Sequence, residues 1–365
     1  MRKRNKTSQF GLSLIEMMIA ITLGLLIMAG LTSILVTNSR ARNEVERANR
    51  QIENGRYALQ MLTDDLRLAG YLAEFNPNPL ADPAALPDPC TTTLANLVSD
   101  LPLHVQGVNN VTSSTLPSCL SVSDVKMGTD ILVIRRASTC VLGVAGCEPV
   151  IANAPYFQAS RCSNIAGVEL NAPGTTATAL NGQHFLIAAN NLTLHNRACT
   201  AAADISRYRT HIYFVANNNN ASDGIPTLKR WELGALTNPV PLVEGIENFK
   251  IEYGIDNLPA STVVGDGIPD NFFVDPSTIT LNAATPSIIS AWRQVVAAKI
   301  FLLARNTEST VGFVDRKTYT MSSDGSQTNP CSGFSGGQLT TCQSFKRHAY
   351  QSVVRMNNPA SRRAP

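Results

Sequence analysis

The stretch that decides the fold is GLSLIEMMIAITLGLLIMAGLTSILV, residues 11–36, near the start of a chain of 365 residues. Between Leu12 and Val36 the only charged residue is Glu16. About 20 apolar residues suffice for a helix to cross a bilayer, so residues 12–36 predict a membrane span. The positive-inside rule predicts a cytoplasmic N-terminus, because four basic residues precede the span: Arg2, Lys3, Arg4 and Lys6.

The order of these parts differs from that of a secretory signal peptide. A signal peptide carries about 7–15 apolar residues ahead of a small-residue cleavage site, so cutting removes them. Here the candidate cleavage site, after Gly11, comes before the apolar segment. Cutting there would remove residues 1–11 and leave the membrane span on the mature chain.

Glu16 is the candidate functional residue of the span. A carboxylate at the centre of a membrane helix costs about 2.5–3.5 kcal/mol on insertion scales, so an acidic residue there is a functional candidate by default. The alternative is that Glu16, near the cytoplasmic end, reaches the headgroups and has no role. Cleavage at Gly11 would free an α-amine on Leu12, four residues ahead of Glu16.

The junction GLSLIEMMIA, residues 11–20, resembles that of type IV prepilins, with Gly before the cut and Glu five residues after it. The resemblance implies cleavage between Gly11 and Leu12 by prepilin peptidase and N-methylation of Leu12. It also implies that Glu16 pairs with the N-terminal amine of a neighbouring subunit in the filament. The chain departs from most prepilins in having Leu12 where they have Phe.

An amphipathic helix is predicted to continue the span from residue 37 to Tyr71. No Pro occurs before Pro77, and small or apolar residues recur at alternating spacings of three and four. This seam predicts packing against the chain's own β domain, with a coiled-coil dimer as the alternative. Its members are Val45, Ala48, Ile52, Gly55, Leu59, Leu62, Leu66 and Ala69.

Residues 72–365 predict a β-rich globular domain, so the fold class is α+β and pilin-like: a long N-terminal helix packed on an antiparallel β domain. A Pro-rich loop at 77–89 follows the helix. Val, Ile, Tyr and Phe then gather in short runs that predict strands, and 217–224 predicts the turn between the second and third of them. The runs are 130–136, 209–216, 228–233, 247–255 and 292–305, the last being a long strand or a helical turn entering one.

Eight cysteines, all beyond the helix, are an even number and predict disulfides in an oxidising compartment. Eight cysteines allow 105 connectivities. Neighbour pairing is favoured for the two short loops, Cys140–Cys147 and Cys331–Cys342. It would also join Cys90 to Cys119 and Cys162 to Cys199.

Composition argues against a general affinity for nucleic acid. The net charge of +3 includes the four positive charges of the leader, so the chain beyond residue 11 carries about −1. The five His residues are scattered and no C-x-x-C pair occurs, so neither a zinc site nor a cofactor is predicted. A weak calcium motif, Asp266 and Asp270 with Asp256 at a distance, is better interpreted as a polar turn.

One catalytic motif occurs, G-x-S-x-G at 333–337. It needs a strand before it and a helix after it, whereas here it lies between Cys331 and Cys342 in a Gly- and Ser-rich stretch. We therefore expect a loop at this position and no enzymatic activity.

Later blocks resemble the PilW family of minor pilins and related minor pseudopilins: 55–71, 242–256, 292–305 and 353–359. Residues 80–240 carry no recognisable family motif. The resemblance implies a low-abundance pilus subunit of the inner membrane, with a periplasmic C-terminal domain, that helps to initiate assembly at or near the tip. The implied partners are prepilin peptidase, other minor pilins, the major pilin and the assembly platform. The alternatives are a minor pseudopilin of a type II secretion system and a membrane-anchored periplasmic binding or hydrolytic domain.

Overall fold

The structure is a computed structural model that describes residues 11, 13–162, 182–235, 239–256, 265–274 and 287–363. The chain divides into two compact units, Met1–Arg50 and Gln51–Pro365. Their secondary structure begins with helix α1 (Leu14–Arg67) and continues, in the second unit, with α2 (Leu94–Asp100), β1 (Val105–Val108), β2 (Ile131–Val141), β3 (Tyr156–Ser160), β4 (His184–Ala188), β5 (Ile205–Ala216), β6 (Thr227–Glu232), β7 (Val240–Glu244), β8 (Ile246–Ile255), β9 (Asn271–Phe273), α3 (Ile288–Arg293), β10 (Val295–Arg305), β11 (Tyr319–Thr320), β12 (Gln327–Thr328), α4 (Gly336–Gln343), β13 (Arg347–Arg355) and α5 (Asn357–Ser361).

The described residues of the second unit form two antiparallel sheets and a short hairpin. In the larger sheet the order is β1-β2-β5-β3-β4, and β6 and β7 extend it from β5. In the smaller sheet the order is β13-β10-β8-β9, and β11 pairs with β12. Antiparallel pairing with hairpin connections fits the predicted α+β class.

The predicted strands are confirmed. The run at 209–216 lies in β5 and that at 228–233 in β6, and the two pair as a hairpin, with Ala216 opposite Thr227. The run at 292–305 is a helical turn entering a strand, the second of the two alternatives predicted for it: α3 ends at Arg293 and β10 begins at Val295. Along β8 the alternation also holds, because Phe249, Ile251 and Tyr253 enter the main core.

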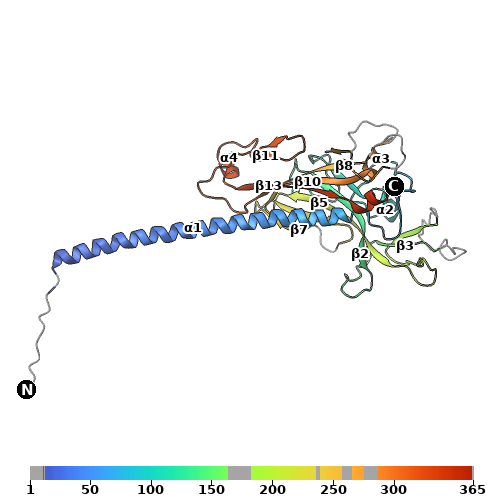
Figure 1. Ribbon diagram of the computed structural model, residues 1–365, viewed down its shortest axis with the longest axis horizontal. Coiled ribbons are helices and arrows are strands. Elements are labelled where there is room, and N and C mark those ends of the chain that lie inside the picture. The colour runs from blue at the N-terminus through green and yellow to red at the C-terminus, as the bar shows by residue number, and fades with distance from the viewer. Residues whose placement is uncertain are drawn as a thin grey trace, which may run out of the picture. The chain divides into compact units, whose positions relative to one another are not determined.

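That core joins the last turns of α1 to both sheets. Ala58, Leu62 and Leu66 of α1 are fully buried in one cluster with residues of β2, β5, β8 and β10, and these turns run alongside the strands in Figure 1. The upper seam therefore packs on the chain's own β domain, as expected. Val45 and Ile52, both predicted in the seam, are instead 60% and 44% exposed.

Helix α1 ends at Arg67, four residues before the predicted end at Tyr71. Gly70 adopts a left-handed conformation with φ of +69°, which stops the helix in the manner usual for glycine beyond a C-terminus. The side chain of Asn358 donates to the carbonyls of Leu68 and Ala69, and Arg362 donates to that of Gly70. The C-terminal segment thus satisfies carbonyls at the end of α1.

Candidate assembly interface

The predicted processing residues precede α1 in the sequence, and the predicted assembly residue lies at its N-terminal end. The helix begins at Leu14, and its first backbone hydrogen bond runs from the N–H of Met17 to the carbonyl of Ser13. Glu16 lies in the first turn, where the positive end of the helix dipole favours a carboxylate. Gly11 is exposed, whereas Leu12 lies outside the described residues.

The apolar part of α1 is exposed on all sides within the chain. Leu14 is 78% exposed, and Leu26 and Leu35 are each 69% exposed. The helix is long and apolar enough to cross a membrane, with none of its most apolar 18 residues buried. Monomeric soluble proteins rarely expose a contiguous apolar surface of this extent, so it needs lipid or the helices of other subunits around it.

The other end of α1 is held to the sheet by a buried charged cluster. The carboxylate of Asp65 is only 6% exposed and accepts three hydrogen bonds. Arg136 Nε of β2 donates at 2.7 Å, His211 Nδ1 of β5 at 2.7 Å and Tyr213 Oη at 2.8 Å. A carboxylate removed from water retains its charge only with such partners, so Asp65 connects the helix to two strands.

The charges of this cluster set its ionisation. Burial alone would raise the pKa of Asp65, but His211 and Arg136 outweigh burial and hold it well below its usual value. Glu232 of β6 lies 3.5 Å from His211 Nε2. Burial would raise its pKa too, yet His211, Arg209 and Arg207 lower it to about 2. Both carboxylates are therefore ionised in the folded protein at neutral pH.

Sequence reasoning missed Asp65, because the seam was read from apolar residues alone. The signal was present: Asp65 lies between Leu62 and Leu66, both predicted to be buried. A charged residue at such a position predicts an oppositely charged partner on the facing element. Gln51 was missed in the same way: its side-chain amide donates to the carbonyls of Ala304 and Lys346.

The aspartates of the weak calcium motif make other contacts. Asp256 Oδ2 accepts hydrogen bonds from the N–H of Gly267 and from Arg363 Nε. Asp266 accepts from the N–H of Ile268, which makes a local turn, and Asp270 lies just before β9. Within the described residues, no three His, Cys, Asp or Glu side chains are grouped so as to hold a metal.

The eight cysteines form four disulfides, Cys90–Cys119, Cys140–Cys147, Cys162–Cys199 and Cys331–Cys342. The two short loops, Cys140–Cys147 and Cys331–Cys342, close as predicted, and the other two disulfides also join neighbouring cysteines. Ser335 of the G-x-S-x-G motif lies inside the last loop, directly before α4. It follows turns and not a strand, so the geometry of a nucleophile elbow is absent at this motif.

Two family models match the chain. The model for the prokaryotic N-terminal methylation motif matches residues 6–32, the predicted processing junction and most of the span. The model for the type IV pilus-assembly protein W, PilW, matches residues 212–358, from the middle of β5 to α5, and so includes residues 212–240, where the sequence alone showed no recognisable family motif. The two matched regions are those of a PilW-like type IV pilin.

Together these matches identify a minor pilin of the type IV pilus, a membrane-anchored structural protein that interacts with other pilins and the pilus machinery. Among solved structures, it is similar to the type IV-like pilin TTHA1219 from Thermus thermophilus, with 12% identity and a TM-score of 0.29. That similarity covers 85% of this chain and 98% of the other. No curated protein matches the sequence.

Proposed function

We propose that this PilW-like pilin is cut between Gly11 and Leu12 by prepilin peptidase and is then methylated on the new amine of Leu12. The match to the N-terminal methylation motif over residues 6–32 is the observation that carries the proposal. The apolar segment of α1 stays on the mature chain, where the membrane and later the filament core cover it.

Glu16 then pairs with the methylated N-terminus of a neighbouring subunit. The pairing offsets the cost of holding a carboxylate and an ammonium away from water, and removing one partner of a buried pair typically costs about 3–5 kcal/mol. Glu16 is the only acidic residue between Leu12 and Val36, so within the span no other carboxylate can take the place of its charge.

The subunit sits with its N-terminus in the cytoplasm and its β domain in the periplasm before assembly. The four basic residues of the leader support this orientation, and the four disulfides suit an oxidising compartment. It contacts other minor pilins, the major pilin and the assembly platform, helps to initiate the pilus at or near its tip, and has no catalytic role.

The first test is the N-terminal mass of the protein purified from its own cells. We expect a chain beginning at N-methylated Leu12. A chain beginning at Met1, or cut elsewhere, would contradict the proposed processing and favour the alternative of a plain membrane anchor on a binding or hydrolytic domain.

The second test replaces Glu16. Because Glu16→Ala removes one charge of the pair and not the cleavage site, we expect a protein that is inserted and cleaved but poorly incorporated into sheared pili. Ser33→Ala, another exposed polar residue of α1, serves as the matched control. Normal incorporation of Glu16→Ala would contradict the pairing.

A deletion strain separates the pilus from a type II secretion system. Loss of surface pili with normal protein secretion supports the pilus, which the PilW match favours. Normal piliation with impaired secretion would instead identify a minor pseudopilin.

A further inference from the structure

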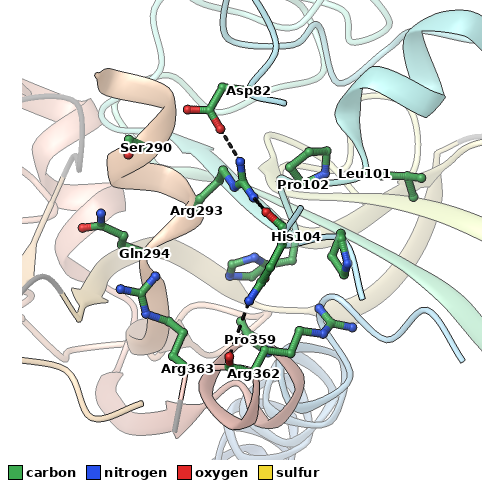
Figure 2. Close-up of a pocket in the computed structure, with 12 residues that line it drawn as sticks. Asp82, Leu101, Pro102, His104, Ser290, Arg293, Gln294, Pro359, Arg362 and Arg363 are labelled. Atoms are coloured by element: carbon green, nitrogen blue, oxygen red, sulfur yellow. Dashed lines mark hydrogen bonds and ion pairs between the residues drawn. The ribbon is translucent and has the colours of Figure 1, made fainter. Parts of the chain in front are cut away.

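A cavity of about 240 Å³ lies in the β-rich unit. Four segments line it: the Pro-rich loop after α1, the residues leading into β1, the end of α3, and the segment at and after α5. Figure 2 shows Arg293 and Asp82 on one side of it and Arg362 and Arg363 on the other. Because three arginines line so small a space, the partner of each positive charge has to be identified.

Two of these arginines have a carboxylate partner. Arg293 pairs with Asp82 and also donates to the carbonyls of Leu80 and Asn78, so it ties α3 to the Pro-rich loop. Arg363 Nε donates to Asp256 Oδ2 at 3.0 Å. Its Nη2 donates to the backbone carbonyl of Asp256 at 2.7 Å. Structural roles therefore account for the charges of Arg293 and Arg363.

Arg362 differs from both. Its Nη2 donates to the carbonyl of Gly70 at 2.7 Å, and within the described part of the chain the guanidinium forms no other hydrogen bond and no ion pair. A guanidinium has five N–H donors, so most of the N–H groups of Arg362 remain available to bind a ligand. Burial lowers the pKa of Arg362 to about 10, and no acidic group among the described residues opposes the shift. The end of α1 beside it supplies only about half a negative charge.

The pKa of His104, which also lines the cavity, is lowered in part by the positive charges around it. Its ring is buried and donates from Nε2 to the carbonyl of Val295 at 2.7 Å. Burial lowers the pKa of His104 to about 3, and the charges of Arg362, Arg363 and Arg293 act in the same direction. The ring is therefore neutral, and an anion would relieve the repulsion among the three guanidinium groups.

We propose that this cavity binds a carboxylate, held by Arg362 with Arg363 beside it. A guanidinium matches a carboxylate because its two parallel N–H groups can bind both oxygens. Sites for drug-sized ligands occupy about 300–1,000 Å³, so a cavity of about 240 Å³ suits a small free acid or one acidic side chain. The inference is independent of the role of Glu16 and of processing at Gly11.

The test is a calorimetric titration of the full chain in detergent with succinate at low ionic strength. We expect saturable binding that Arg362→Gln weakens about tenfold or more, as the loss of a charge-assisted hydrogen bond implies. Arg316→Gln, which removes an exposed arginine elsewhere, should change the affinity less than twofold. Equal binding of succinate by the wild type and Arg362→Gln would overturn the proposal, and so would absence of binding by both succinate and the acidic peptide described below.

Two further variants keep the test decisive if Arg362→Gln does not fold. Arg362→Lys retains the charge and a donor for Gly70 but loses the two parallel N–H groups, so succinate should bind several-fold more weakly. Ser290→Phe fills the cavity from α3 and leaves every arginine in place, so it should abolish binding. If both variants fold and their affinity for succinate is unchanged, the anion binds elsewhere and the proposal is wrong.

A pair of blocked peptides distinguishes the two sources of a carboxylate. We compare acetyl-Gly-Glu-Gly-amide with its Gln analogue. Tighter binding of the Glu peptide than of succinate indicates an acidic side chain of another protein, whereas tighter binding of succinate indicates a small free acid. Equal binding of the Glu and Gln peptides, together with no binding of succinate, would contradict a carboxylate site.

Discussion

Among single residues, Asp65 makes the clearest prediction for stability. Asp65→Asn keeps the shape of the side chain but removes the charge that Arg136, His211 and Tyr213 contact. We expect a loss of about 3–5 kcal/mol in the free energy of unfolding, because breaking a buried charged cluster leaves its partners uncompensated. Urea denaturation followed by the fluorescence of Trp231 and Trp292 measures it.

The neighbouring residue provides the control. Asp64 is exposed and pairs with Arg67 one turn along the helix, at 3.6 Å. Asp64→Asn should change the free energy of unfolding by less than about 1 kcal/mol, as is usual for exposed ion pairs. Equal effects at the two positions would show that Asp65 contributes no more than a surface charge.

Among the elements, α1 depends on a close approach to β13 at Gly55. A Cβ on Gly55 would overlap the ring of Tyr350, so the helix lies closer to the strand than alanine allows. Gly→Ala inside a helix ordinarily gains about 1 kcal/mol. Here we expect Gly55→Ala to destabilise the protein by about 1–3 kcal/mol, the usual cost of overpacking.

A double-mutant cycle checks this reason. In a Tyr350→Ala background the ring is gone, so Gly55→Ala should become neutral or stabilising. Urea denaturation of the wild type, the two single variants and the double variant gives the coupling free energy. Destabilisation of the same size in both backgrounds would mean that Tyr350 does not limit the approach of α1.

For the molecule as a whole, stability should fall on acidification. Asp65 and Glu232 have folded pKa values below those of the unfolded chain, about 4, so their contribution is present above that pH and is lost below it. His104 also lowers the stability of the folded protein on acidification, and its effect begins at a higher pH, because the pKa of its ring is about 6.5 in the unfolded chain and about 3 in the folded protein. Burial raises the pKa of Asp100 and Asp130, which act in the opposite direction.

Differences between variants isolate these contributions. The gap in unfolding free energy between wild type and Asp65→Asn should shrink as the pH falls from 7 to 3. His104→Gln should instead flatten the pH dependence between about 6.5 and 4, where the unfolded histidine takes up a proton. A gap that stays constant from pH 7 to pH 3 would contradict the assignment of Asp65.

Local sequence patterns predicted the helices and strands well, because each helix or strand depends mainly on residues close together in the sequence. The apolar run after Gly11 predicted the membrane helix, and alternation predicted β8 with Phe249, Ile251 and Tyr253 in the core. Ends and exceptions were harder to predict. The stop at Arg67 depends on Gly70 and on contacts from Asn358 and Arg362, about 290 residues away, and the exposure of Ile52 depends on which face of α1 meets the sheets.

The sequence by itself determined the α+β class and the resemblance to PilW pilins, and it predicted the order of leader, cleavage site and span, since periodicity, charge and motif spacing are local properties of the chain. Only the tertiary structure decided the cluster around Asp65, the contact between Gly55 and Tyr350, and the cavity at Arg362. The physical reason is that these features join charges and side chains from distant segments. Their pairing is selected by burial and geometry, which no local pattern records.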